Sequence, residues 1–231
     1  MPVSTVISRE EYLRRWSSVH GGYDPRRSRV VHGWLVGVYA ASRPFAALRL
    51  SPDVVTLLGP LLAGAAVWAA WPGGPAGRVV LAAALVTVSA LADSLDGAVA
   101  VLTGRTSRFG AVWDSLADRV AEVGYLVVLA RVGAPVSLVV AAGVTSLLAE
   151  YVRARAGMVG MVEVAVVTVG ERPTRVVVTV MALLAGAVVG HPAGWAAAGA
   201  WAWWVTAAVG LVQLLVVVRR RLGDDTRPPS A

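Results

Sequence analysis

DSLDGAVAVLTGRTSRFGAVWDSLADR, residues 93–119, places four aspartates inside a chain that is otherwise rich in apolar residues. Asp93 and Asp96 are three residues apart, and Asp114 and Asp118 are four residues apart. On a helix, both spacings put the two side chains of a pair on one face. Two helices joined by a turn over residues 103–110 would therefore bring the two pairs together.

Carboxylates that converge repel one another, and they are costly to place away from water. A bound hard cation removes both problems, and carboxylate oxygens favour Mg²⁺, Mn²⁺ or Ca²⁺ over zinc. The pattern therefore predicts a divalent-metal site whose ligands are Asp93, Asp96, Asp114 and Asp118.

The composition indicates a membrane protein. Of the 231 residues, 57% are hydrophobic, which is too apolar for an ordinary soluble domain. The chain has no cysteine, so disulfides and thiolate chemistry are excluded. The net charge is +7 and every basic residue is an arginine. No basic module with interleaved aromatic residues is visible, so we expect the arginines to set membrane topology rather than to bind nucleic acid.

Six apolar segments are long enough to predict an all-α integral membrane protein with six transmembrane helices, at residues 54–71, 79–102, 111–130, 136–151, 176–190 and 195–218. Residues 30–42 are apolar at helical spacing but too short to span a bilayer, and Arg43 and Pro44 follow them. This segment predicts an N-terminal juxtamembrane interfacial helix, with a loop packed on the bundle as the alternative. Asp53 is the expected N-cap of the first span.

These segments divide the chain into an N-terminal cytoplasmic part (1–49), a transmembrane catalytic domain (50–218) and a polar cytoplasmic tail (219–231). With both termini inside the cell, every arginine except Arg78 and Arg131 lies on the cytoplasmic side. The same rule predicts that residues 157–170 do not cross the membrane, and leaves open whether they form a loop or a re-entrant lid. It places the aspartates at the cytoplasmic side of a multi-pass cell-membrane protein.

The aspartate stretch resembles the motif D-x2-D-G-x2-A-R-x8-G-x3-D-x3-D of the CDP-alcohol phosphatidyltransferases. Both glycines, the alanine and all four aspartates match, and Val101 stands where the family has arginine. The resemblance implies six transmembrane helices with a juxtamembrane helix, usually in a homodimer. It also implies an enzyme that transfers a phosphatidyl group from CDP-diacylglycerol to an alcohol, releases CMP and uses Mg²⁺ or Mn²⁺.

The resemblance further implies roles for single residues. Asp93, Asp96 and Asp114 would hold the metal, and Asp118 would be the general base that also touches it. The nucleotide part of CDP-diacylglycerol would contact Asp53, Val54, Val55, Thr56, Gly97, Ser107 and Gly110. Arg105 would replace the arginine missing at position 101 if the second span continues that far.

Within the family, the chain is most similar to the actinobacterial phosphatidylinositol phosphate synthases. The similarity includes SPDVVTLLG (51–59), SRFGAVWDS (107–115), YVRARA (151–156) and ERPTR (171–175). It implies an inositol phosphate acceptor whose phosphate is bound by Arg153, Arg172 and Arg175, a role for which guanidinium groups are well suited. The alternative for these arginines is a purely topological role.

Three other functions remain open. Glycerol 3-phosphate is a second anionic acceptor, which would make the enzyme a phosphatidylglycerophosphate synthase. A divalent-cation transporter would use the aspartates as its pathway, but it predicts acidic residues through the depth of the membrane. A non-catalytic membrane scaffold is the third function, because Val101 replaces the arginine of the family motif. Glu122, four residues after Asp118, is expected to be a structural partner rather than a metal ligand.

Overall fold

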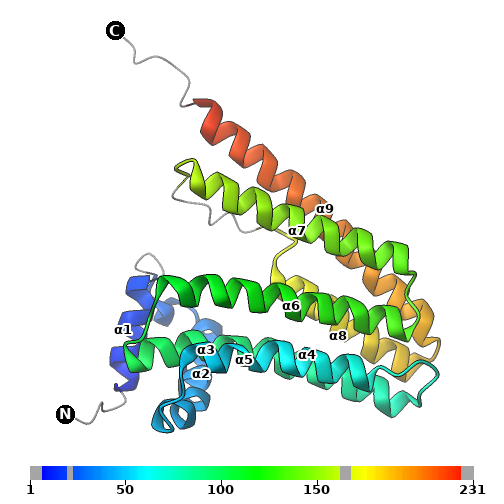
Figure 1. Cartoon of the computed structure of the whole chain (residues 1–231), viewed down its shortest axis with the longest axis horizontal. Helices are drawn as coiled ribbons and strands as arrows, with labels where there is room; N and C mark the ends of the chain where they lie inside the picture. Colours follow the sequence, from blue (N-terminus) through cyan, green and yellow to red (C-terminus); the bar gives the residue numbers. More distant parts are fainter. Residues whose placement is uncertain (1–6, 20–22, 162–167, 225–231) are drawn as a thin grey trace. The chain divides into compact units, whose positions relative to one another are not determined.

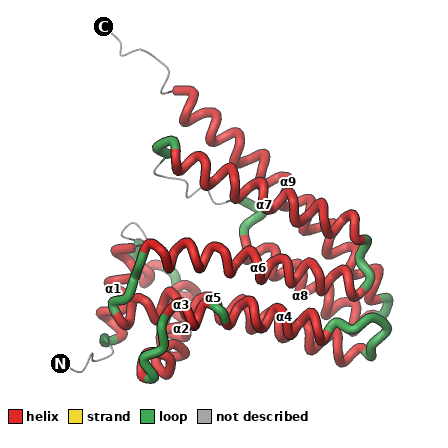
Figure 2. Tube along the Cα trace, viewed as in Figure 1, coloured by secondary structure: helices red, strands yellow, loops and turns green. Residues whose placement is uncertain are grey.

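The computed structural model describes residues 7–19, 23–161 and 168–224, and every regular secondary-structure element in these residues is a helix (Figure 2). In chain order the helices are α1 (Arg9–Val19), the 3-10 helix η1 (Pro25–Arg27), α2 (Arg29–Ala47), α3 (Pro52–Thr56), α4 (Leu58–Ala69), α5 (Ala76–Thr103), α6 (Arg108–Val132), α7 (Val136–Met158), α8 (Arg172–Val189) and α9 (Pro192–Asp224) (Figure 1). The predicted all-α class is therefore confirmed.

The chain divides into two compact units, of which the first comprises residues 1–63 and 88–121 and the second residues 64–87 and 122–231. Helices α4, α5 and α6 each contribute residues to both units. The first unit carries the aspartates, and the second carries the arginines of the YVRARA and ERPTR segments.

In the first unit, α1 packs against α2 and was not expected from the polar residues 1–29. Tyr12 and Leu13 of α1 are buried in an apolar cluster with residues of α2 and α5. Helix α2 begins after its N-cap Ser28, whose hydroxyl accepts a hydrogen bond from the Val31 N–H. It runs past Arg43 and Pro44 to Ala47, further than predicted, because Pro44 lies in the last turn and costs only one helical hydrogen bond there.

The first predicted span consists of two helices, α3 and α4, separated at Leu57. Pro60 has no N–H to donate to the carbonyl of Thr56, which accounts for the interruption. The expected N-cap was wrong: Ser51 occupies the cap position, Pro52 opens the helix, and Asp53 lies in its first turn. The Ser89 hydroxyl of α5 donates a 2.7 Å hydrogen bond to the carbonyl of Gly59 in α4 and is fully buried.

In the second unit, α7 and α8 both pack against α9. The buried Trp203 indole of α9 donates a 3.0 Å hydrogen bond to the hydroxyl of Ser146 in α7. Gly199 allows α9 to approach α8 closely, since a Cβ at this position would lie 2.5 Å from the Cβ of Ala182. Helix α7 continues through the whole YVRARA segment, which was expected to follow the span rather than belong to it.

Five helical segments among the described residues are long and apolar enough to cross a membrane: Pro52–Ala69, Ala76–Thr103, Val136–Met158, Arg172–Val189 and Pro192–Leu222. These correspond to five of the six predicted spans. Helix α6 has the required length, but charged residues lie along it from Arg108 to Arg131. Of the segment 157–170, residues 162–167 lie outside the described residues, and 168–170 are not helical.

Candidate active site

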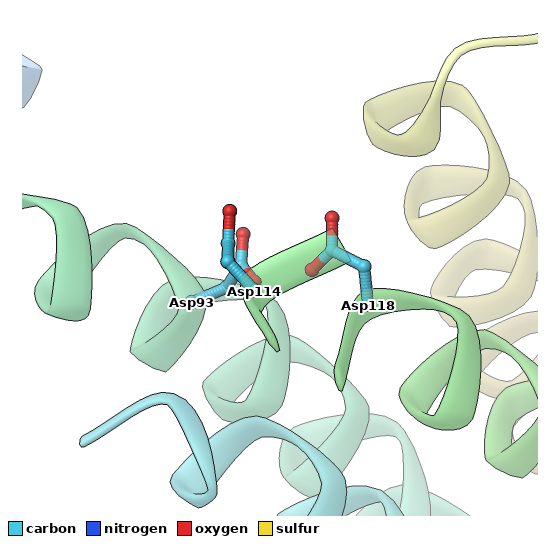
Figure 3. A group of neighbouring side chains, drawn as sticks. All are labelled: Asp93, Asp114 and Asp118. Atoms are coloured by element: carbon cyan, nitrogen blue, oxygen red, sulfur yellow. The ribbon is translucent and has the colours of Figure 1, made fainter. Parts of the chain in front are cut away.

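Three of the four aspartates meet in the first unit (Figure 3). Asp93 comes from α5, and Asp114 and Asp118 come from α6 one turn apart. Each offers a carboxylate oxygen, and these oxygens all lie within 4.8 Å of one another. All three side chains are half-buried. We call Asp93, Asp114 and Asp118 the carboxylate cluster.

Capping at both sides of the α5–α6 turn positions this cluster. Gly104 ends α5 with φ of +66°, a conformation that glycine adopts without strain. The Arg105 N–H then donates a 3.0 Å hydrogen bond to the carbonyl of Ala100, the pattern of a Schellman motif. Ser107 directly precedes α6, and its hydroxyl accepts a 2.8 Å hydrogen bond from the Gly110 N–H, as an N-cap does. The short turn thus fixes where α6 starts and which of its faces meets α5.

Asp96 is not one of the three residues of the carboxylate cluster, but it lines the same cavity as Asp93 and Asp114. Three residues of α-helix turn by about 300°, so two side chains at this spacing point about 60° apart. Asp96 is only 5% exposed, and its Oδ1 accepts a hydrogen bond from the Gly97 N–H. Its Oδ2 is buried without a hydrogen-bond partner. A buried carboxylate oxygen in that state is costly unless a ligand satisfies it.

A cavity of about 670 Å³ opens beside these aspartates within the first unit. Asp93, Asp96 and Asp114 line it, and so do five of the seven residues predicted to contact the nucleotide: Asp53, Thr56, Gly97, Ser107 and Gly110. The other two, Val54 and Val55, do not line it. The Trp113 indole donates a 3.0 Å hydrogen bond to the carbonyl of Asp53, which ties α3 to α6 at the cavity.

The oxygen donors at this site suit a hard divalent cation. Three carboxylates share a space small enough for one ion to contact all of them, and Asp96 adds a buried oxygen that lacks a partner. Magnesium and manganese favour such all-oxygen sites, whereas zinc favours nitrogen and sulfur ligands. The residues present therefore fit the predicted metal.

Val101 and Arg105 both line the cavity. Helix α5 ends at Thr103, so the continuation of the second span to Arg105, on which the proposed role of this arginine depended, does not occur. It nevertheless lines the cavity from the turn that follows α5. The sequence reasoning missed the contribution of α1, whose Tyr12 and Trp16 also line the cavity. The apolar residues of REEYLRRW recur at helical spacing and were the available signal.

In the second unit, Arg153 and Arg175, two of the three predicted acceptor-binding arginines, lie in a network of ion pairs. The buried Arg175 places Nη1 at 2.9 Å from both carboxylate oxygens of Glu122. Its Nη2 lies 3.8 Å from Glu150, which is also 3.7 Å from Arg153. Glu122 is thus a structural partner, as predicted. Arg172 opens α8, directly after Glu171.

Glu171 completes the network. It accepts hydrogen bonds of 2.9 Å from the Thr168 N–H, the Thr168 hydroxyl and the Arg153 guanidinium. Partial burial alone would raise the pKa of this carboxyl, but the bonds from Thr168 and Arg153 outweigh it and lower the pKa of Glu171 below its usual value. Glu171 is therefore held in its ionised form beside Arg153.

Comparison with known proteins agrees with these features. The chain is 37% identical over 185 residues to the phosphatidylinositol phosphate synthase of Mycolicibacterium smegmatis, covering 75% of this chain and 80% of that protein. It is 35% identical over 147 residues to the archaetidylinositol phosphate synthase of Methanothermobacter thermautotrophicus, covering 63% and 71% respectively.

Among solved structures, the phosphatidylinositol phosphate synthase of Mycobacterium tuberculosis with CDP-DAG bound superimposes with a TM-score of 0.60 and 28% identity. The match covers 79% of this chain and 93% of that one. The same enzyme in complex with manganese and citrate gives the same TM-score, over 78% of this chain and 88% of that one. The family model for CDP-alcohol phosphatidyltransferases matches residues 49–212, which include the carboxylate cluster, and this chain belongs to that family.

Proposed function

We propose that this enzyme transfers the phosphatidyl group of CDP-diacylglycerol to a hydroxyl of a phosphorylated inositol and releases CMP. The carboxylate cluster at the cavity is the observation that carries the proposal. Three converging carboxylates favour a divalent cation, and a cation held there suits a substrate that brings a pyrophosphate. The relatives named above support an inositol phosphate acceptor, because the bacterial ones are phosphatidylinositol phosphate synthases.

The proposed chemistry is a single displacement at phosphorus. The acceptor oxygen forms a bond to the phosphorus that carries diacylglycerol, and the pyrophosphate bond to CMP breaks, with the bridging oxygen leaving on CMP. Asp118 takes the proton of the acceptor hydroxyl. Asp93, Asp96 and Asp114 would hold Mg²⁺ or Mn²⁺, which when bound neutralises the pyrophosphate and polarises its oxygens.

The cavity offers places for the rest of the nucleotide. Asp53, Thr56 and Ser107 present polar groups around it, and Gly97 and Gly110 line it without side chains. A Cβ at Gly110 would lie 3.0 Å from the Ser107 hydroxyl, so a larger residue there would disturb the N-cap of α6. Arg105 supplies a cationic group at the cavity where Val101 cannot.

We propose that Arg153, Arg172 and Arg175 form the site for the acceptor phosphate. Arg175 is 3% exposed and bonded to both oxygens of Glu122. Its role in this site is therefore to position the neighbouring side chains rather than to contact the phosphate directly. Arg153 is bonded to Glu171, and an acceptor phosphate would replace that carboxylate as the partner of Arg153. Arg172, next to Glu171 in sequence, would make the third contact.

We further propose that six helices cross the membrane: the five apolar segments described above and, in addition, α6. A helix that carries the metal ligands must contain charged residues, and this explains why α6 lacks the composition of an ordinary span. Helix α2 would lie along the cytoplasmic membrane surface, both termini would be cytoplasmic, and the active site would face the cytoplasm. The family resemblance supports a homodimer.

The experiment is an assay of CMP release by the purified protein in lipid nanodiscs, with CDP-diacylglycerol, Mg²⁺ or Mn²⁺, and one acceptor at a time. We expect release that requires both the metal and inositol phosphate, and that stops when EDTA is added. Release only with glycerol 3-phosphate would support the transfer of a phosphatidyl group but contradict inositol phosphate as the acceptor. No release with any acceptor and either metal would overturn the proposed activity.

A further inference from the structure

Two pairs of arginine and tryptophan lie in the second unit, where α4 and α6 end and α5 begins. The guanidinium carbon of Arg78, in the first turn of α5, lies 5.0 Å from the centroid of the Trp68 ring. That of Arg131, in the last turn of α6, lies 5.2 Å from the centroid of the Trp71 ring. We call Trp68, Trp71, Arg78 and Arg131 the arginine–tryptophan cluster. The proposed function uses none of these residues.

Both guanidinium groups are fixed at the C-terminal end of α4. Arg78 Nη2 donates a 3.4 Å hydrogen bond to the carbonyl of Trp68, and Arg131 Nε donates a 3.2 Å hydrogen bond to the carbonyl of Ala70. The last carbonyls of a helix have no partner within the helix, and these cations satisfy two of them. A Cβ at Gly74 would lie 3.2 Å from Cδ of Arg78, so glycine leaves room for this side chain beside the turn. The two arginines are thus held in place around one helix end.

No carboxylate in the described part of the chain neutralises these arginines. Aspartate and glutamate are absent from the segments that surround them, residues 54–92, 123–149 and 176–223. Glu122 is the nearest acidic residue to Arg131 on α6, nine residues or about 13 Å along the helix, and it is bonded to Arg175. Each guanidinium also keeps N–H groups that its carbonyl bond does not use. Two fixed cations without a counterion favour an anionic ligand.

The place of the cluster in the fold favours a lipid as that ligand. Trp68 lies in the last turn of the apolar segment Pro52–Ala69 and Arg78 in the first turn of Ala76–Thr103, and both segments are able to cross a membrane. Trp68 and Trp71 are 66% and 58% exposed. Exposed tryptophans at the ends of membrane spans lie at the level of the lipid headgroups. The guanidinium groups stacked on them therefore lie at the depth of the lipid phosphates.

We propose that the arginine–tryptophan cluster is a binding site for the headgroup phosphate of an anionic phospholipid. Guanidinium groups form strong, charge-assisted hydrogen bonds with phosphate oxygens. The indole rings hold the guanidinium groups by cation–π contact. Arg78 and Arg131 bind the phosphate, and Trp68 and Trp71 position them. A zwitterionic headgroup fits less well, because its ammonium group would meet two cations that no carboxylate offsets.

This lipid site is distinct from the carboxylate cluster and does not depend on the proposed activity. Arg78 and Asp93 lie fifteen residues apart on α5, which corresponds to about 22 Å along the helix. The lipid held by the arginine–tryptophan cluster is therefore not the substrate at the aspartates. It connects the ends of α4, α5 and α6. A ligand that binds only the folded protein stabilises it, so anionic lipid should raise the melting temperature.

The test measures Tm of the full-length protein in detergent micelles supplemented with phosphatidylglycerol or with phosphatidylcholine. The quantity compared is the difference between the two Tm values, because a variant's own loss of stability cancels in it. We expect a higher Tm with phosphatidylglycerol in the wild type, and the loss of most of this difference when Arg78→Gln and Arg131→Gln are combined. Glutamine is neutral but keeps a hydrogen-bond donor for the carbonyls of α4. Arg219→Gln, which removes an exposed arginine of α9, is the matched control and should keep the difference.

Native mass spectrometry measures the affinity for phosphatidylglycerol in the same samples. We expect Arg78→Gln and Arg131→Gln each to weaken binding by about tenfold, as for the loss of a hydrogen bond to a charged group. Trp71→Leu should weaken it by about threefold through the loss of the cation–π contact, while Trp71→Phe should have a smaller effect. Unchanged affinity in both arginine variants would overturn the proposal.

Three further outcomes would contradict the lipid site. Equal stabilisation by phosphatidylcholine would show that the cluster does not select an anionic headgroup. Stabilisation by inorganic phosphate alone, equal to that by phosphatidylglycerol and lost in the double variant, would identify a site for a free anion instead of a lipid. A loss in Arg219→Gln as large as in the double variant would show that general surface charge, rather than the arginine–tryptophan cluster, attracts the lipid.

Discussion

Charged side chains are arranged in opposite ways in the two units. In the first unit, three carboxylates from α5 and α6 converge within 4.8 Å of one another. In the second unit, carboxylates and guanidinium groups alternate from Glu122 through Arg175, Glu150 and Arg153 to Glu171. Like charges brought together gain stability from a cation supplied from outside, whereas alternating charges stabilise one another. The first arrangement is typical of a metal site, and the second of a scaffold that holds helices in register.

Asp118→Asn should have the largest effect on activity. The change removes the proposed base while leaving the other aspartates in place, and general-base catalysis contributes about 10² to 10⁴ in rate. We expect kcat to fall by about that factor and the affinity for CDP-diacylglycerol to change little. The measurement is CMP release together with CDP-diacylglycerol binding in nanodiscs. Asp24→Asn, in the N-terminal segment away from the cavity, is the control. A near-normal kcat in Asp118→Asn would show that Asp118 is not the general base.

Breaking the buried pair in the second unit should mainly reduce stability. Arg175→Leu alone leaves Glu122 without its main partner, which costs about 3–5 kcal/mol for a buried pair. Replacing both residues by leucine should cost less than the single change, since no isolated charge remains. Thermal unfolding of the single and double variants measures this coupling. Equal stability of Arg175→Leu and the wild type would show that the pair contributes nothing to the fold.

Arg105→Ala should raise the KM for CDP-diacylglycerol by about tenfold, corresponding to the loss of one hydrogen bond to a charged group. Arg105 lines the cavity, and its backbone is fixed by the Schellman turn, so the helices should remain intact. Arg108→Ala, at the exposed first residue of α6, provides the matched control. An unchanged KM in Arg105→Ala would show that the cavity does not use this arginine in place of the one missing at position 101.

The smallest effect should come from Glu171. Because its pKa is lowered in the folded protein, its ionised form contributes stability above the unfolded value of 4.5, and this contribution is lost as the pH falls through the lower, folded pKa. Glu171→Gln should therefore reduce stability at pH 7 by about 1 kcal/mol or less, as for partly exposed ion pairs. The difference between variant and wild type should disappear at acidic pH. Melting temperatures between pH 3 and about pH 8 test this, and a difference that grows on acidification would refute it.

The local features of the carboxylate cluster could be predicted from the sequence. Asp114 and Asp118 share a face because residues four apart on a helix always do, and Gly104 and Ser107 carry the signals of a helix end and a helix start. Asp96 marks the limit of this reasoning. Its spacing from Asp93 leaves an angular offset, and only packing decides that one carboxylate faces the cluster while the other is buried at 5% exposure.

The arginines illustrate the same limit in the second unit. Their sequence suggested either a phosphate site or a role in membrane topology, and neither interpretation included an ion pair within the protein. In the structure Arg175 bonds to Glu122, 53 residues earlier in the chain. No periodicity links two residues at that separation, because the contact depends on how α8 meets α6.

The sequence by itself determined the helical class, the apolar segments, the metal-type ligands and their motif, because helix geometry and solvent preference act over a few residues. The tertiary structure decided which of these groups meet. It docked the polar α1 on the apolar cluster beside Val101, joined α3 to α6 through Trp113 and Asp53, and brought Asp93 together with Asp114 and Asp118. Those outcomes depend on the packing of helices distant in sequence, where burial of side chains rather than local spacing sets the arrangement.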